Sequence, residues 1–266
     1  MRKFAPIITI LLLTTLLSAQ TPSAVIPIIE DNGGVIGGVK AGKWVKAETF
    51  APSMTGNQEY RLVDWVDGGT GELWRGGKPE AAVPCEDYYQ AELEPKTGTG
   101  IALGAAATWN PVPRVPVAIS LTDATYATIV SSIVRAHGIA RPKVGIKQIY
   151  SVDLDGDGTN EVILAATYRK SDGLSPNAVA GEYSLLLVRK LVGGKVRNIL
   201  VASEFHRRAV KFGAISEFTI DAIGDLNGDG KMEVVMGSSY YEGNGSVVYE
   251  IPGAVAKEVL STGCGV

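Results

Sequence analysis

Two short stretches of the chain carry oxygen-bearing side chains at spacings suited to holding a cation. The first is "DLDGDGTNE", in which Asp153, Asp155 and Asp157 stand at positions 1, 3 and 5, Thr159 at position 7 and Glu161 at position 9. Hard cations such as Ca²⁺ take about six to eight oxygen ligands in loosely constrained geometry, so carboxylates at alternate positions with a backbone carbonyl between them suit such an ion. The spacing predicts a calcium site formed by these four carboxylates and the Thr159 carbonyl.

The second stretch, "DLNGDGKME", repeats the first 72 residues later without a gap. It predicts a second calcium site, formed by Asp225, Asn227, Asp229, the carbonyl of Lys231 and Glu233. Mg²⁺ requires stricter octahedral geometry and keeps more of its water, so the pattern favours Ca²⁺. Without a cation, like charges gathered at one turn would repel one another.

An EF-hand is the obvious alternative for both loops, and the sequence excludes it. Position 12 of an EF-hand loop holds a bidentate glutamate, whereas here it is Leu164 in one loop and Met236 in the other. The flanking residues are also rich in Val, Ile and Tyr, which is typical of strands. Both loops are therefore expected on β-hairpins.

Both loops resemble the calcium loops of FG-GAP and VCBS-type repeats, which form the blades of integrin-α-like β-propellers and occur in many exported bacterial proteins. The resemblance covers about residues 144 to 251 and implies calcium binding by the ten residues named above. Position 9 is usually aspartate in that family and is glutamate here. Only two good copies are present, whereas a closed propeller needs about 4–8 blades.

Strand patterns surround both loops, and they determine the fold class. Gly193-Gly194 predicts a hairpin between two apolar runs, and "GNG" at 243–245 predicts another. A helix is expected from a cap at Thr122 or Asp123 to Gly138, with apolar residues at helical spacing. We expect a mainly β protein with antiparallel sheets, two propeller-blade-like units and one packed helix; the alternative is an α+β fold with an open antiparallel sheet.

The chain divides into three parts. Residues 1–19 have a short basic region, an apolar run and small polar residues, which is typical of a signal peptide. Residues 20–120 read as an N-terminal β-rich region of unknown role, with the proline-rich "PVPRVPVAIS" as a boundary or an edge strand. Residues 121–266 hold the helix and the two calcium-loop repeats. We expect a secreted or periplasmic protein with no transmembrane segment once the signal is removed.

Charge and cysteine content limit the partners. The formal net charge is −3 and no basic cluster exceeds Arg207-Arg208, so nucleic acid is not an expected partner. A protein or glycan partner remains. Cys85 and Cys264 could form a disulfide in an oxidising compartment, or stay as two free thiols.

Two functions agree with these features. The first is an exported calcium-binding β-repeat module with a non-catalytic binding or structural role at the cell surface or in the periplasm. The alternative is a secreted hydrolase with its active site in residues 20–120 and the repeats as a scaffold. No catalytic residues are assigned, because the only two histidines, His137 and His206, have no recognisable base or nucleophile beside them in the sequence.

Overall fold

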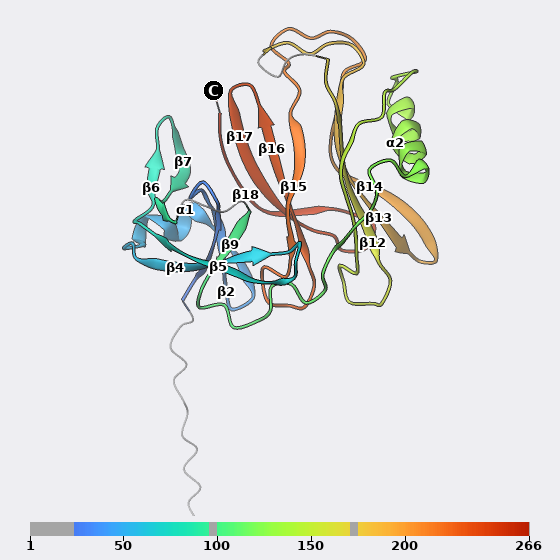
Figure 1. The fold of residues 1–266 in the computed structure, drawn as a ribbon. Helices are drawn as coiled ribbons and strands as arrows, with labels where there is room; N and C mark the ends of the chain where they lie inside the picture. Colours follow the sequence, from blue (N-terminus) through green and yellow to red (C-terminus); the bar gives the residue numbers. More distant parts are fainter. Residues whose placement is uncertain (1–23, 96–99, 171–174, 266) are drawn as a thin grey trace, which may run out of the picture.

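The computed structural model describes residues 24–95, 100–170 and 175–265 (Figure 1). The predicted signal peptide, residues 1–19, lies outside these ranges. The described chain is mainly β, as predicted, and it forms several antiparallel sheets with two short helices and no closed barrel. Neither helix in the described residues has the length and apolar character needed to cross a membrane.

The N-terminal part builds one large sheet and one small hairpin. The large sheet has seven strands in the order β3 (Lys43–Lys46), β2 (Val35–Lys40), β1 (Ile26–Glu30), β9 (Ile101–Gly104), β4 (Gln58–Asp64), β5 (Gly69–Gly76) and β8 (Leu93–Glu94). The small hairpin pairs β6 (Glu80–Ala82) with β7 (Cys85–Gln90). A one-turn helix α1 (Ala47–Phe50) and a 3₁₀ turn η1 (Ala51–Ser53) follow β3.

The two repeats form a sheet each. The first contains β10 (Val117–Ala118), β11 (Ile146–Val152), β12 (Glu161–Tyr168), β13 (Tyr183–Val192) and β14 (Lys195–Phe205) in that spatial order. The second contains β15 (Glu217–Gly224), β16 (Glu233–Tyr240), β17 (Gly243–Glu250) and β18 (Lys257–Gly265). Each acidic loop thus joins the first two strands of a four-stranded antiparallel unit, and β10 is an edge strand added to the first unit from the proline-rich segment.

Both predicted hairpins are present, and one of them has its turn at another position. The turn at Gly193-Gly194 is confirmed, because Val192 pairs with Lys195 across it. The hairpin predicted around 243–245 is present as β16 and β17, but its turn is displaced: Tyr240 pairs with Gly243, so β17 begins there and the turn lies at residues 241–242. These glycines serve close packing instead, since a Cβ at Gly243 would lie 2.5 Å from the carbonyl oxygen of Cys264 on β18.

The predicted helix is present as α2 (Ala124–Ala136). The side chain of Asp123 accepts a hydrogen bond from the N–H of Thr125, which caps the first turn. Val130 and Val134 are fully buried against the first repeat, where Leu164 and Leu185 lie in the same cluster. The helix covers one face of that sheet, which explains why β12 and β13 are apolar on both faces.

One hydrophobic core joins the N-terminal sheet to both repeats. It includes Ile28 and Val63 from the N-terminal sheet, Val152 from the first repeat, and Ile220 and Leu260 from the second. Figure 1 shows β15–β18 lying between the N-terminal sheet and β12–β14. The second repeat is therefore the central layer, and the opposite face of the N-terminal sheet has a core of its own around Tyr60 and Trp74.

A disulfide joins the small N-terminal hairpin to the last strand. Cys85 on β7 and Cys264 on β18 are bonded, with their Cα atoms 5.6 Å apart and 179 residues between them in the sequence. The structure thus selects the paired state from the two that the sequence left open.

We predict that replacing both cysteines, C85S/C264S, lowers the free energy of unfolding by about 2–4 kcal/mol, because the closed loop restricts the unfolded chain. Urea unfolding of the oxidised protein and of the double variant measures this difference. Wild-type protein treated with a thiol reductant serves as the control and should unfold at the same urea concentration as the double variant. Equal midpoints for the oxidised and double-variant proteins would show that the disulfide adds no stability.

Candidate metal centre

The first acidic loop is folded around the carboxylate of Asp153. This carboxylate accepts hydrogen bonds from the N–H groups of Gly156 (2.7 Å), Asp157 (3.2 Å) and Gly158 (2.9 Å). The chain can curl in this way because Gly156 and Gly158 adopt φ angles of 77° and 86°, which residues with a Cβ rarely take. The two glycines therefore allow the tight turn that brings three N–H groups to one carboxylate.

The second loop repeats these contacts. The carboxylate of Asp225 accepts hydrogen bonds from the N–H groups of Gly228 (2.7 Å), Asp229 (3.2 Å) and Gly230 (2.9 Å). The two loops thus share their local geometry as well as their sequence. Both lie between antiparallel strands, which confirms that neither belongs to an EF-hand.

The glutamate at position 9 is the first residue of the outgoing strand in each repeat, and it is 1% exposed in both. Glu161 accepts a hydrogen bond from the N–H of Leu154 at 2.8 Å, and Glu233 accepts one from the N–H of Leu226 at 2.8 Å. The longer side chain of glutamate thus reaches back to position 2 of its own loop.

Burial makes the charge on these glutamates costly. The pKa of Glu161 is raised chiefly by burial, and burial raises the pKa of Glu233 to about 9. Smaller contributions at Glu233 come from the nearby charges of Asp225, Asp229 and Glu250. A cation at the loop would oppose both effects, because it favours the ionised carboxylates.

The first loop brings three predicted ligands together. Carboxylate oxygens of Asp153, Asp155 and Glu161 lie within 4.8 Å of one another, close enough to share one ion. The Oδ1 atom of Asp155 is also buried and has no hydrogen-bond partner in the described residues. An unsatisfied buried carboxylate oxygen is a ready ligand position, so this donor set fits Ca²⁺.

The remaining predicted ligands take part in hydrogen bonds within their own loops. Asp157 accepts a hydrogen bond from the N–H of Thr159 at 2.7 Å, and Asp229 accepts one from Lys231 at 2.8 Å. Asn227 is buried, and its side-chain oxygen accepts the N–H of Asp229 at 2.8 Å. Eight of the ten predicted residues therefore lie in the two turns, and the other two, Glu161 and Glu233, begin the strands that leave them.

Lys190, which no pattern in the sequence marked, brings a cation to the first loop. Its Nζ donates to Oδ2 of Asp155 at 2.6 Å, lies 3.9 Å from Oε1 of Glu161 and donates to the carbonyl of Ile251 at 3.3 Å. The lysine side chain is 5% exposed. Its hydrogen bond to Asp155 is the main cause that lowers the pKa of that carboxyl group. The first loop thus carries an internal positive charge.

The second loop has an acid where the first has this lysine. Val162 pairs with Arg189 in the first unit, and Val234 pairs with Tyr249 in the second. The residues that follow Arg189 and Tyr249, which are Lys190 and Glu250, therefore hold equivalent positions on the third strands. Glu250 is held by Trp44, whose Nε1 donates at 2.7 Å, and by Lys257 at 3.0 Å. The two otherwise similar loops therefore differ in the charge that approaches them from the third strand.

The segment that precedes α2 ties the loops to each other. The guanidinium of Arg114 donates hydrogen bonds to the carbonyls of Asp153 and Leu154 in the first loop, the latter at 3.2 Å. It also donates to the carbonyl of Gly230 in the second loop at 2.8 Å. Trp109 donates from Nε1 to the carbonyl of Asp225 at 2.8 Å. Neither residue carried a signal in the sequence, because the contacts join segments far apart along the chain.

Comparison with protein-family models identifies part of this region. An FG-GAP repeat is found at residues 219–249, a range that includes the second acidic loop and most of β15 through β17. Searches of curated proteins and of solved structures gave no match. The chain thus contains a β-repeat of the FG-GAP type. Because Asp153 and Asp225 make the same set of backbone contacts, residues 146–205 form a second unit of similar local design.

We predict that stability in calcium-free buffer falls as the pH rises from about 4.5 to about 9. Across this window folded Glu233 keeps its proton, with a pKa near 9, whereas the unfolded side chain, with a pKa near 4.5, loses it. The folded state therefore binds more protons, and its free energy of unfolding decreases with pH.

Urea unfolding in the presence of a chelator, repeated across this pH range, measures the slope. The variant Glu233→Gln cannot ionise and should show a smaller slope. Glu72→Gln, at an exposed position on β5, is the control and should keep the wild-type slope. A slope unchanged by Glu233→Gln would contradict the prediction.

Proposed function

We propose that the protein is an exported, calcium-stabilised β-repeat module with a non-catalytic binding or structural role. The single observation that supports this best is the shared geometry of the two loops. In each, the first aspartate accepts hydrogen bonds from three backbone N–H groups, and a buried glutamate closes the turn. Such a turn gathers negative charge that a divalent cation would neutralise. Export is inferred from the N-terminal signal pattern and agrees with a disulfide between distant segments.

The proposed ligands are those expected from the sequence. In the first loop they are Asp153, Asp155, Asp157, Glu161 and the Thr159 carbonyl. In the second they are Asp225, Asn227, Asp229, Glu233 and the Lys231 carbonyl. Calcium would join the strands of each unit at one end, so its role would be to stabilise the fold that presents a binding surface. We further propose that the repeats are of the VCBS type and that the protein is located at the bacterial cell surface or in the periplasm.

The second loop should bind calcium more tightly than the first. At the first loop the ammonium of Lys190 already lies 2.6 Å from a proposed ligand oxygen. A calcium ion would have to displace this group or be repelled by it, whereas the second loop has no such competitor on the equivalent strand position, where Glu250 stands. The alternative of a secreted hydrolase has no comparable observation in its favour among the described residues.

We predict that calcium titration of chelated, signal-free protein detects two sites and that the melting temperature rises on binding. Affinities in the range of about 10⁻⁴–10⁻³ M are typical of extracellular modules. The variant Asp229→Ala should lose the tighter site and Asp155→Ala the weaker one. Isothermal calorimetry measures the stoichiometry, and Asp67→Ala, at an exposed turn of the N-terminal region, is the control. No heat and no shift in melting temperature would contradict the proposal.

A second prediction concerns Lys190 alone. In an Asp229→Ala background only the first loop can bind, and there Lys190→Met should raise the calcium affinity by about tenfold or more, because a repelling charge is removed. Lys195→Met, at the exposed end of the same hairpin, is the matched control and should leave the affinity unchanged. An unchanged affinity for Lys190→Met would show that the ammonium moves aside without cost.

A further inference from the structure

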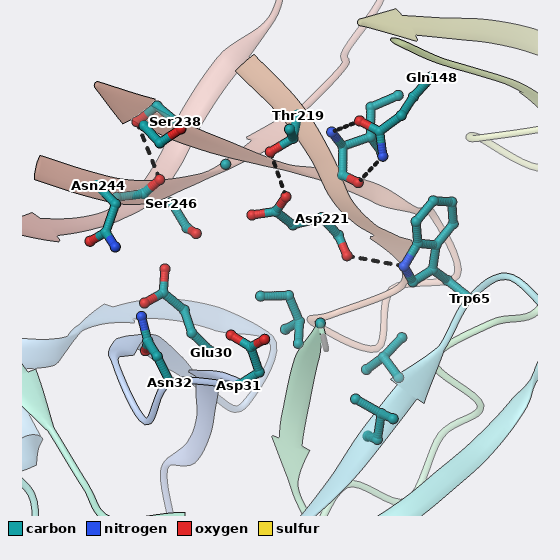
Figure 2. Close-up of a pocket in the computed structure, with 18 of the residues that line it drawn as sticks. Glu30, Asp31, Asn32, Trp65, Gln148, Thr219, Asp221, Ser238, Asn244 and Ser246 are labelled. Atoms are coloured by element: carbon teal, nitrogen blue, oxygen red, sulfur yellow. Dashed lines mark hydrogen bonds between the residues drawn. The ribbon is translucent and has the colours of Figure 1, made fainter. Parts of the chain in front are cut away.

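A cavity lies between the N-terminal sheet and the second repeat, away from the two acidic loops (Figure 2). Its volume is about 660 Å³. One side is formed by the end of β1 and the following turn, with Glu30, Asp31 and Asn32. The other side is formed by β15 and β17, with Asp221 and Ser246 among the lining residues. The volume falls in the range of small-molecule sites, which is about 300–1,000 Å³.

The walls of this cavity carry one sign of charge. Figure 2 shows the side chains of Glu30 and Asp31 on one side of the cavity and Asp221 on the other. Among the described residues that line the cavity, none is lysine, arginine or histidine. The described part of the lining therefore offers carboxylates and hydroxyls to a ligand and no cationic side chain.

Two glycines make room for these carboxylates. A Cβ at Gly237 on β16 would lie 2.2 Å from Oδ2 of Asp221, and a Cβ at Gly34 would lie 2.3 Å from Oε2 of Glu30. Either alanine would push a carboxylate out of its place, since real Cβ atoms do not approach so closely. The backbone around the cavity is thus shaped to hold acid side chains where they are.

Hydrogen bonds fix the acids further. Thr219 donates from Oγ1 to Oδ1 of Asp221 at 2.7 Å, and the indole of Trp65 donates to the Asp221 carbonyl at 3.0 Å. Glu30 is 7% exposed, and the hydroxyl of Tyr88 lies 3.4 Å from its Oε2. Because both acids are held in fixed positions, a ligand would meet a preorganised arrangement of charge.

The electrostatics of the cavity favour a cationic occupant. Burial raises the pKa of Glu30 and of Asp221, and the charge of Asp221 raises the pKa of Glu30 further. The charge of Asp31 acts in the same direction on Asp221. A positive group between the two sides would stabilise the ionised form of each acid.

The labelled cavity acids lie on two sides of the cavity rather than in one close group of three. Among the described residues, the close group of three carboxylates that could share one ion is at Asp153, Asp155 and Glu161, and none of the cavity acids belongs to it. Acids spread over two sides of a cavity of about 660 Å³ suit a longer ligand with more than one charge. Primary ammonium and guanidinium groups donate several hydrogen bonds to carboxylates, and a flexible chain can carry two such groups, one for each side of the cavity.

We propose that this cavity binds a small organic polycation through the carboxylates of Glu30, Asp31 and Asp221. The recognised chemistry is a set of ammonium or guanidinium groups on a flexible apolar chain. The proposal deepens the binding role assigned above and rests on that role, but it needs no calcium in the cavity. Such groups could come from a free polyamine or from basic side chains of a peptide.

Calorimetric titration with two probes tests the proposal, using full-length mature protein in saturating calcium so that the acidic loops do not compete. Spermidine represents a free polyamine, and an end-blocked Lys-Gly-Lys peptide represents basic side chains. At least one of these probes should bind with one molecule per protein chain. The probe that binds more tightly shows whether the ligand is a free polyamine or a basic peptide. Triethylene glycol, a neutral chain, should not bind.

Variants then place the binding in the cavity. Asp221→Asn should weaken the probe by about tenfold or more, because a charge-assisted hydrogen bond is lost. Glu217→Gln, on the same strand but outside the cavity lining, is the matched control and should bind like wild type. If Asp221→Asn does not fold, as judged by its melting curve, Glu30→Gln gives the same test.

The outcomes separate this proposal from the calcium proposal. No saturable binding of either probe, or equal binding by wild type and Asp221→Asn, overturns the cavity proposal whatever the calcium result. Probe binding that requires Asp221 supports it even if calcium titration gives no heat. The probe titration is then repeated in chelator, where the acidic loops hold no calcium. Binding of the probe in the cavity should persist there and should still depend on Asp221.

Discussion

The glutamate that opens the outgoing strand of each repeat is buried, and its charge must be balanced inside the protein. Glu161 and Glu233 each accept one backbone N–H, from Leu154 and Leu226, and this contact closes the turn. One hydrogen bond does not offset the cost of burying a carboxylate, so each loop needs a proton, a fixed cation or a metal ion. The differences between the two loops follow from which of these the surrounding strands supply.

The first unit supplies a lysine from its own third strand, and the second unit supplies a glutamate from the same position. With Lys190 in place, the first loop has a counter-charge at 2.6 Å from Asp155 before any ion arrives. At the second loop Glu250 adds to the charge that raises the pKa of Glu233. Two loops with nearly the same sequence therefore differ in the charge beside them: the first has an internal ion pair, and the second has an acid at the equivalent position.

The position of the second repeat connects the loops to the rest of the molecule. Its sheet packs between the N-terminal sheet and the first repeat, and the core that joins them includes Ile28, Val152 and Leu260. The same sheet supplies Asp221 and Ser246 to the cavity on its N-terminal side. A change in the stability of the second loop would thus act on the layer that also forms one side of the cavity, which is the physical connection between the proposed calcium site and the proposed ligand site.

The sequence by itself determined the local features: the two β-flanked loops, the helix from Ala124 to Ala136 and the Gly193-Gly194 hairpin, because each depends on periodicity or turn residues within a short window. It misplaced the turn of the β16–β17 hairpin, because the glycines at 243–245 lie within β17 and allow close contact with β18. Only the tertiary structure decided that Cys85 reaches Cys264, that Lys190 enters the first loop and that Glu30 faces Asp221. These pairs are far apart along the chain, and their contacts depend on strand register and on the packing of whole sheets, which no local pattern of residues records.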